Sequence, residues 1–199
     1  PNPVVSRQAC VCTPTCFVPI DRVRIIGERI NPTGKKRFQQ ALLEEDLDYI
    51  LAGDLLNQCI GSSFGLRDFR VPFYGLYGAC STSGEALALA SMGVAAGYGE
   101  AMLAVTSSHF GSAEKEFRFP LSYASQRPLS AHWTVTGSGA FIVGKKKSHV
   151  RVAGVTVGKI VDYGLKDSQN MGACMAPAAC DTIAQNLLSL IHISEPTRH

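Results

Sequence analysis

The stretch PFYGLYGACSTSGEALALASMGVAAGY, residues 72–98, decides the fold of this 199-residue chain. Its first part, 72–77, is rich in aromatic and apolar residues and predicts a strand, whereas the small-residue run 82–98 predicts a helix that is buried on most sides. A fully apolar strand is expected to follow at 101–106. Strands that alternate with helices along the chain indicate an α/β layered fold.

Elements of the same kind are expected on both sides of this stretch. Toward the N-terminus the sequence predicts a linker or extended segment, a strand, a turn, an amphipathic helix and a short apolar strand, at 1–21, 23–26, 31–34, 36–50 and 51–54. Toward the C-terminus it predicts a mainly looped segment, two strands and a helix, at 111–128, 135–144, 150–161 and 180–190. The three lysines 145–147 are expected to form the turn between those two strands.

The composition excludes several classes of protein. With 46% hydrophobic and 18% charged residues, the chain is too apolar to be disordered as a whole. A net charge of +3 is too small to indicate a nucleic-acid partner. The most apolar segment, 86–105, contains several glycines and Glu100, so it predicts a buried helix, a turn and a strand rather than a membrane span.

The seven cysteines do not predict a disulfide framework, because their number is odd and no signal peptide is visible. A reducing cytosol is the compartment that this favours. Cys10, Cys12 and Cys16 are close enough in sequence to suggest a metal cluster, but no histidine or second cysteine pair stands near them. We therefore expect incidental thiols there, and we predict neither a metal site nor a cofactor.

The strongest chemical feature is Cys80, which stands in GACSTSG between the predicted strand and the predicted helix. The first turn of a helix favours a thiolate, which is the nucleophilic form of cysteine. A buried and inert thiol is an equally good interpretation of the position alone. A nucleophile also needs a proton acceptor, and His109, at the end of the strand predicted at 101–106, is the best-placed histidine in sequence.

A second group of residues surrounds two prolines in the predicted loop and consists of Arg118, Arg127 and Trp133 with neighbouring charges. Two guanidinium groups with an aromatic ring could clamp a planar, acidic ligand through bidentate hydrogen bonds and stacking. Ordinary loop charges are the alternative interpretation, and the residues alone favour it.

Seven segments resemble the stage V sporulation protein AD family and occur in the family's order: LAGDLLNQ (51–58), GLYGACSTS (75–83), AVTSSH (104–109), FRFP (117–120), QRP (126–128), WTVTGSGA (133–140) and MGACMAPAA (171–179). The resemblance covers about residues 52–188. It implies the first half of a thiolase-like fold, in which two related α/β halves pack together. It also implies a protein that binds dipicolinic acid (pyridine-2,6-dicarboxylate) and helps to load it into the developing spore.

The resemblance also indicates a site. Cys80 matches the position of the thiolase nucleophile, so Cys80 and His109 are expected to line the pocket, with Arg118, Arg127 and Trp133 as chemical candidates for binding the dianion. In the thiolase superfamily the second half supplies the partners of the cysteine, and the resemblance covers the first half only. A complete acyl-transfer site is therefore not expected within this chain. We leave open whether it is an enzyme, with a thiolase-type acyltransferase using Cys80 as the alternative to a binding protein.

Two further resemblances suggest a chimeric fragment. Residues 23–51, VRIIGERINPTGKKRFQQALLEEDLDYIL, are similar to the start of the pterin-binding domain of cobalamin-dependent methionine synthase, with the preceding residues as its linker. This gives a methyltetrahydrofolate–homocysteine methyltransferase fragment as another alternative, although one strand and one helix cannot close a barrel. The tail, 189–199, resembles translated sequencing adaptor. The expected divisions are thus 1–51, non-native to the family, then 52–188 and 189–199, and a non-functional chimera is a further alternative.

The same resemblance sets the expected surroundings of the protein. The partners that it implies are dipicolinic acid, other proteins of the same sporulation operon and a second copy in a homodimer of the full-length parent. The expected location is peripheral, on the cytoplasmic face of the forespore inner membrane, with no transmembrane segment.

Overall fold

The structure is a computed structural model, and it describes residues 10–11, 16–19, 23–31, 47–56, 59–108, 137–158, 160–161, 163–166 and 171–194. The chain divides into two compact units. The larger unit is continuous in sequence, Ile20–Ala153. The smaller unit combines two segments, Pro1–Pro19 and Gly154–His199.

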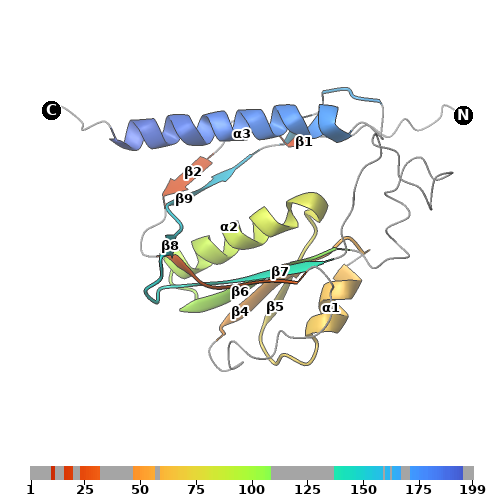
Figure 1. The fold of residues 1–199 in the computed structure, drawn as a ribbon, viewed down its shortest axis with the longest axis vertical. Helices are drawn as coiled ribbons and strands as arrows, with labels where there is room; N and C mark the ends of the chain where they lie inside the picture. The colour runs from red at the N-terminus through yellow and green to blue at the C-terminus, as the bar shows by residue number, and fades with distance from the viewer. Residues whose placement is uncertain are drawn as a thin grey trace, which may run out of the picture. The chain divides into compact units, whose positions relative to one another are not determined.

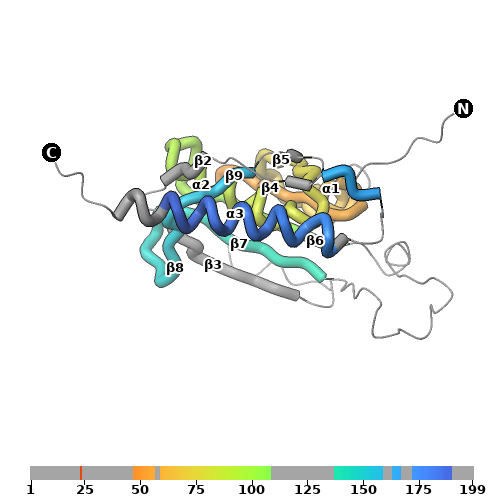
Figure 2. Tube along the Cα trace, turned by 90° about the horizontal axis from the view of Figure 1, so that it is seen from above, coloured from red at the N-terminus to blue at the C-terminus, as the bar shows by residue number. Residues whose placement is uncertain are grey.

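One mixed sheet forms the centre of the larger unit (Figure 1), with the strand order β5-β4-β6-β7-β3-β8. Its strands are β3 (Arg24–Asn31), β4 (Tyr49–Gly53), β5 (Phe73–Leu76), β6 (Ala101–Ser107), β7 (Ser138–Gly144) and β8 (Val150–Arg151). β4 pairs in parallel with both β5 and β6, whereas the pairs formed by β7 with β6 and with β3 are antiparallel. β6 and β7 lie side by side in both ribbon and tube views (Figures 1 and 2). This mixed sheet with its helices confirms the predicted α/β class.

Two helices lie on opposite faces of that sheet (Figure 1): α1 (Ile60–Leu66) and α2 (Thr82–Ala95). The sequence prediction extended α2 to residue 98, but the helix ends at Ala95 because Gly97 takes a left-handed conformation with φ 83°. The N–H of Tyr98 then donates to the carbonyl of Gly93 at 3.0 Å. This arrangement closes a helix C-terminus and satisfies carbonyls that would otherwise lack donors.

Alternating residues of the central strands face opposite sides and build two layers of core. One layer contains aliphatic residues from β4, β6 and β7: Ile50, Ala52, Ala101, Leu103, Val105, Ala140 and Ile142. On α2, buried residues recur at helical spacing, with Thr82, Ala86, Ala90 and Val94 all 1% exposed or less. β4 is buried on both faces, and this explains why its sequence is continuously apolar rather than alternating.

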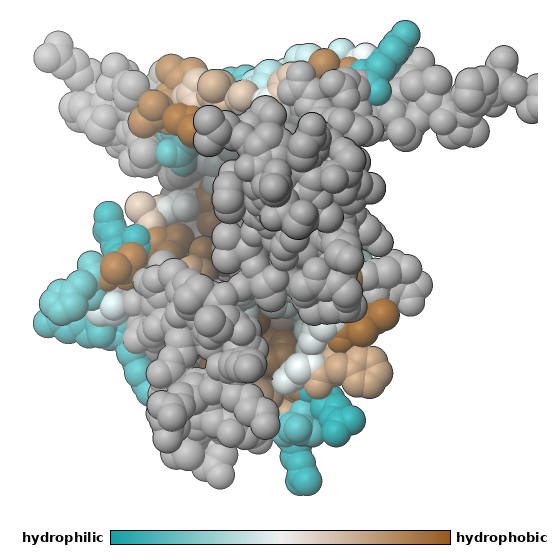
Figure 3. Space-filling view, turned by 45° about the vertical axis from the view of Figure 1, so that its right-hand side comes forward, coloured by the Kyte–Doolittle hydropathy of each residue, from teal (hydrophilic) through white to brown (hydrophobic). Residues whose placement is uncertain are grey.

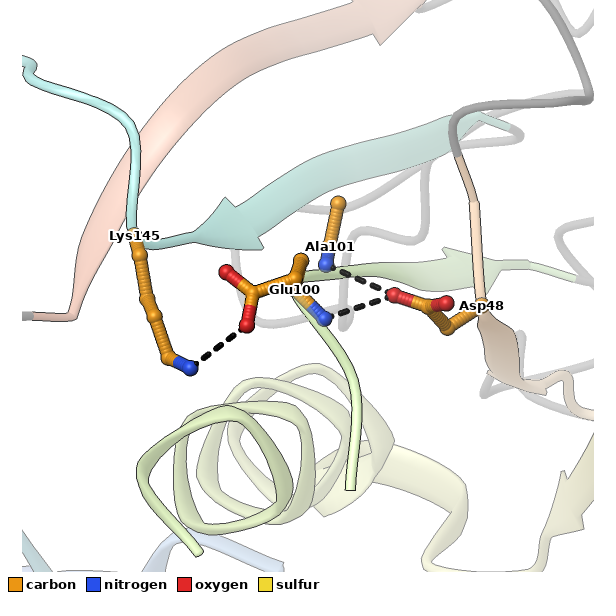
Figure 4. Close-up of polar contacts among 4 residues, drawn as sticks. All are labelled: Asp48, Glu100, Ala101 and Lys145. Carbon is orange, nitrogen blue, oxygen red and sulfur yellow. Dashed lines mark hydrogen bonds and ion pairs between the residues drawn. The ribbon is translucent and has the colours of Figure 1, made fainter. Parts of the chain in front are cut away.

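An aspartate fixes the start of β6 beside β4 (Figure 4). Oδ2 of Asp48 accepts hydrogen bonds from the N–H groups of Glu100 and Ala101, at 2.7 and 3.0 Å. Gly99 leaves room for this carboxylate, since a Cβ there would lie 2.8 Å from it. The Glu100 carboxylate in turn pairs with Nζ of Lys145 at 2.7 Å, on an exposed surface.

The smaller unit consists of two antiparallel ribbons and a long helix. β1 (Cys10–Val11) pairs with β10 (Ile160–Val161), and β2 (Cys16–Pro19) pairs with β9 (Gly154–Val157). The helix α3 (Met171–Ser194) meets β9 through a hydrogen bond from Nδ2 of Asn186 to Oγ1 of Thr156, at 2.7 Å. Several of its large apolar residues are nevertheless exposed, namely Met175, Ile183, Leu187 and Leu188. Hydrophobic side chains, brown in Figure 3, are accordingly visible at the molecular surface.

Several predicted boundaries were wrong. Ile50, the last residue of the helix predicted at 36–50, lies in β4, and the rest of that segment up to residue 46 lies outside the described residues. Asn31 is the last residue of β3, and the rest of the turn predicted at 31–34 lies outside the described residues. The segment 1–21, predicted as a linker or extended segment, contains the strands β1 and β2, whose hydrogen-bond partners lie in 154–161.

At the C-terminal side the elements also differ in length from the prediction. The strand expected at 150–161 is divided into β8, β9 and β10. The helix expected at 180–190 extends over Met171–Ser194, although Pro177 lies inside it and proline is a poor interior residue of a helix. The loop predicted at 111–128 lies outside the described residues.

The cysteines differ from the expectation in one respect. Cys174 is disulfide-bonded, whereas Cys59, Cys80 and Cys180 are free thiols. The sequence argument against disulfides therefore missed one bond. No helix in the described part of the chain has both the length and the apolar character needed to cross a membrane.

Candidate functional site

The turn that carries Cys80 connects β5 to α2 at the carboxyl end of the parallel strands. β5 ends at Leu76, and a single 3-10 turn, Ala79–Ser81, leads directly into α2. Cys80 is exposed and has a free thiol. The predicted strand-to-helix position of Cys80 is thus confirmed, and the alternative that it is a buried thiol is wrong.

Local hydrogen bonds hold this turn in shape. The N–H and the hydroxyl of Ser81 both donate to the carbonyl of Gly78, at 2.9 and 2.8 Å, and the N–H of Thr82 donates to the carbonyl of Ala79. Ala79 has φ 48°, in the left-handed region that side chains rarely adopt. The residue before Cys80 is therefore held in an unfavourable conformation by the contacts around it.

A carboxylate from the first turn of α2 approaches the same turn. Glu85 places Oε2 where a Cβ on Gly78 would otherwise lie, together with Oγ of Ser81. That carboxylate oxygen is buried and has no hydrogen-bond partner. A negative charge near the N-terminus of a helix is electrostatically favourable, which offsets part of the cost of burying it.

A second group of polar residues lies at the carboxyl end of β4, next to β5. Asp54, 6% exposed, follows β4 and accepts hydrogen bonds from the N–H and the hydroxyl of Ser62, both at 2.6 Å. Cys59, 2% exposed, donates its thiol proton to the carbonyl of Leu76 at 3.0 Å. Burial and the charge of Asp54 raise the pKa of the Cys59 thiol, so the group is protonated and acts as a donor.

Sequence reasoning found one residue of this region and missed three. Cys80 was identified from its motif, whereas Asp54, Cys59 and Glu85 were not. Asp54 could have been found, since it directly follows an apolar strand at the edge where parallel strands of α/β sheets place their polar residues. His109, Arg118, Arg127 and Trp133 lie outside the described residues, so their placement near Cys80 stays a prediction.

A cavity of about 270 Å³ lies in the same unit, between α2 and the strands β4, β5 and β6. Its lining includes Tyr49, Tyr74 and Tyr98 with Leu89 and Met102, and it does not include Cys80. The rings of Tyr49 and Tyr74 pack at a centroid distance of 5.8 Å. The lining has no charged side chain, so this cavity does not fit a dianion.

Comparisons with known proteins identify what the chain resembles. The family model described as "Stage V sporulation protein AD (SpoVAD)" matches residues 28–194. Stage V sporulation protein AD from Bacillus subtilis (strain 168) is 45% identical over 149 residues, which are 75% of this chain and 44% of that protein. The chain therefore spans less than half the length of this relative.

Two solved structures match parts of the chain. β-Ketoacyl-[acyl carrier protein] synthase III from Thermus thermophilus matches with 22% identity and a TM-score of 0.38, over 53% of this chain and 32% of that one. The 3-oxoacyl-[acyl-carrier-protein] synthase III from Aquifex aeolicus VF5 matches with 14% identity and a TM-score of 0.39, over 71% and 55%.

The family match extends beyond the range 52–188 that the motifs gave, since it begins at residue 28 within β3 and ends at residue 194. The resemblances of 23–51 to methionine synthase and of 189–199 to translated adaptor stay predictions. So do the divisions at residues 51 and 188, which rest on resemblance and not on packing.

Proposed function

Because the chain belongs to the stage V sporulation protein AD family, we propose that it forms part of a site that captures dipicolinic acid for the developing spore. Family membership is the observation that carries this proposal, and the exposure of Cys80 supports the turn around it as the proposed place of the pocket. The chain spans 44% of the length of its Bacillus subtilis relative, so the activity of a whole-length protein is part of the proposal.

Dipicolinate is a planar aromatic ring with two carboxylates. Cationic, forked donors suit carboxylates, and an aromatic face suits the ring, so Arg118, Arg127 and Trp133 are the proposed ligand contacts, with His109 beside Cys80. The backbone N–H groups at the start of α2 add a partial positive charge at the turn. Oε2 of Glu85 acts against an anion, so the ligand is expected on the Cys80 side of the turn, away from Gly78.

Protection of Cys80 from alkylation tests this function. The 199-residue chain is treated with iodoacetamide, and the rate at each cysteine is followed by peptide mass spectrometry with and without dipicolinate. Cys180, which is also free and exposed, serves as the internal reference. Dipicolinate should slow alkylation of Cys80 alone, and pyridine-3,5-dicarboxylate, with its carboxylates displaced, should not. Equal rates at Cys80 with and without dipicolinate would contradict the proposal.

The exposure of Cys80 in the turn directly before α2 supports a second candidate, a thiolase-type acyltransferase. In that reaction the Cys80 thiolate attacks the carbonyl carbon of an acyl thioester, a new thioester forms on Cys80, and the thiolate of coenzyme A leaves. Incubation with acetyl-coenzyme A followed by intact-mass measurement separates the candidates. A stable acetyl adduct that is absent from Cys80→Ser would favour the transferase over the binding protein.

The surroundings of the protein are proposed on the same basis. We place it peripherally at the cytoplasmic face of the forespore inner membrane, with other products of its sporulation operon as partners. A homodimer of the full-length parent is also proposed, supported by β5, which is an edge strand with the exposed side chains Phe73 and Tyr74. Sedimentation velocity of a whole-length family member tests the dimer, and a single monomeric species at micromolar concentration would contradict it.

A further inference from the structure

Two residues with left-handed backbone conformations lie at the carboxyl end of β5. Within the described part of the chain, Cys59 (φ 56°) and Ala79 (φ 48°) are the non-glycine residues with positive φ. Such conformations are unfavourable for residues other than glycine, and they persist where the surrounding contacts determine them. Both residues are connected with the segment 76–79, because Ala79 is part of it and the thiol of Cys59 bonds to Leu76 at its start.

The thiol of Cys59 reaches this segment from a different part of the chain. It donates to the carbonyl of Leu76, seventeen residues further along the sequence, at 3.0 Å. The hydroxyl of Tyr77 lies close to the same place, since a Cβ on Gly75 would be 3.5 Å from that hydroxyl oxygen and 3.7 Å from Sγ of Cys59. Cys59 thus bonds to Leu76, the last residue of β5, which leads through Tyr77 into the turn of Cys80.

The backbone on both sides of Cys59 is hydrogen-bonded to Asp54. The carboxylate of Asp54 accepts the N–H of Leu56 at 2.8 Å and both donors of Ser62 at 2.6 Å, so residues on each side of Cys59 are fixed to the end of β4. Cys59 is 2% exposed, and water does not compete for its thiol proton. Asp54 therefore connects the end of β4 to the start of α1, and the buried thiol of Cys59 connects the start of α1 to the end of β5.

We propose that Cys59 is a positioning residue for Cys80: its buried thiol, in the segment that Asp54 holds, fixes the carbonyl of Leu76 and thereby the turn that presents Cys80. This rests on the proposed function only in so far as Cys80 borders the ligand site. The thiol of Cys59 does not touch the ligand or react. It keeps the Cys80 thiol in a fixed place in the turn Ala79–Ser81, directly before α2.

The experiment measures alkylation of Cys80 by iodoacetamide in the absence of dipicolinate, with Cys180 in the same sample as reference. Cys59→Ala removes the hydrogen bond to the carbonyl of Leu76 and should slow alkylation of Cys80 about three- to tenfold, the range expected for the loss of one buried hydrogen bond. Cys59→Ser, whose hydroxyl can donate to the same carbonyl, should restore most of the rate. Cys180 should react at the wild-type rate in both variants, because it lies in the smaller unit.

A second variant covers the case in which Cys59→Ala does not fold, as judged by circular dichroism. Ser62→Ala removes one of the donors that hold Asp54 and takes away only one oxygen atom, so it should slow alkylation of Cys80 about two- to fivefold. The proposal is overturned if every folded variant alkylates at the wild-type rate at Cys80, or if Cys59→Ser is as slow as Cys59→Ala. Because no dipicolinate is present, these outcomes are independent of whether the chain binds it.

Discussion

Gly53 allows β4 and β5 to approach each other below the Cys80 turn, and Gly53→Ala tests how tightly this region is packed. A Cβ on Gly53 would lie 2.7 Å from Cγ2 of Thr82 and 3.1 Å from the carbonyl carbon of Leu76, and it would collide with the oxygen of that carbonyl. Ordinary contact begins at 3.4 Å, and Leu76 is also the residue that pairs with Gly53 in the sheet. The clash therefore involves backbone and cannot be relieved by a side-chain rotation.

Insertion of one methyl group into a packed backbone region costs about 1–3 kcal/mol. For a urea m-value of about 2 kcal/mol/M, a loss of about 2 kcal/mol lowers the midpoint of unfolding by about 1 M. Urea unfolding followed by far-UV circular dichroism measures this shift. The matched control is Gly65→Ala in α1, where nothing lies within 4 Å, so alanine should stabilise the helix by about 0.5–1 kcal/mol.

The two alanine substitutions are thus expected to change stability in opposite directions. The reasoning is refuted if Gly53→Ala leaves the midpoint within about 0.2 M of the wild-type value. It is also refuted if Gly65→Ala destabilises as much as Gly53→Ala, because the effect would then come from the loss of glycine and not from the close approach of β5.

Three further outcomes are expected. Asp48→Ala should lower the free energy of unfolding by about 1–3 kcal/mol in the same urea assay, because the N–H groups of Glu100 and Ala101 lose their acceptor. Lys145→Ala should change the free energy of unfolding by less than about 0.5 kcal/mol, because the ion pair of Lys145 is exposed. The pKa of the Cys59 thiol is higher in the folded state than in the unfolded state. The contribution of this thiol to stability is therefore complete below about pH 8.5 and is lost as the pH rises through the folded pKa. The free energy of unfolding of Cys59→Ser should fall less steeply above about pH 8.5 than that of the wild type, as measured in the same urea assay. Replacing Arg118 and Arg127 together by glutamine should abolish the protection of Cys80 by dipicolinate, and unchanged protection would show that other cations bind the ligand.

The sequence was most informative where a pattern is local. The small-residue run after Cys80 predicted α2, and the apolar run 101–106 predicted β6, because burial on both sides of a segment is visible in its own residues. Ile50 was assigned to the wrong element, because the apolar positions of β4 happen to continue the helical spacing of the residues before it. The ribbons of the smaller unit were missed for a different reason, since each strand finds its partner far away along the chain.

The candidate site follows the same division. Cys80 was recognised from its own motif, but the role of Cys59 depends on a carbonyl seventeen residues away and on a left-handed conformation that no local signal encodes. Asp54 was visible as the residue that closes an apolar strand, yet its partner Ser62 could be identified only from the fold. Hydrogen bonds between elements are the part of a site that single-sequence reasoning reaches least well.

The discontinuity of the smaller unit has a consequence for synthesis on the ribosome. β2 is translated before the larger unit, but β9, its partner, follows only after the whole of that unit. At roughly 5–20 residues per second, the intervening stretch of about 135 residues takes about 7–27 s. During this interval β2 is an unpaired strand that other chains can engage, while the continuous larger unit is free to fold. Synthesis from the N-terminus therefore favours folding of the larger unit, which contains Cys80, before β2 can pair with β9.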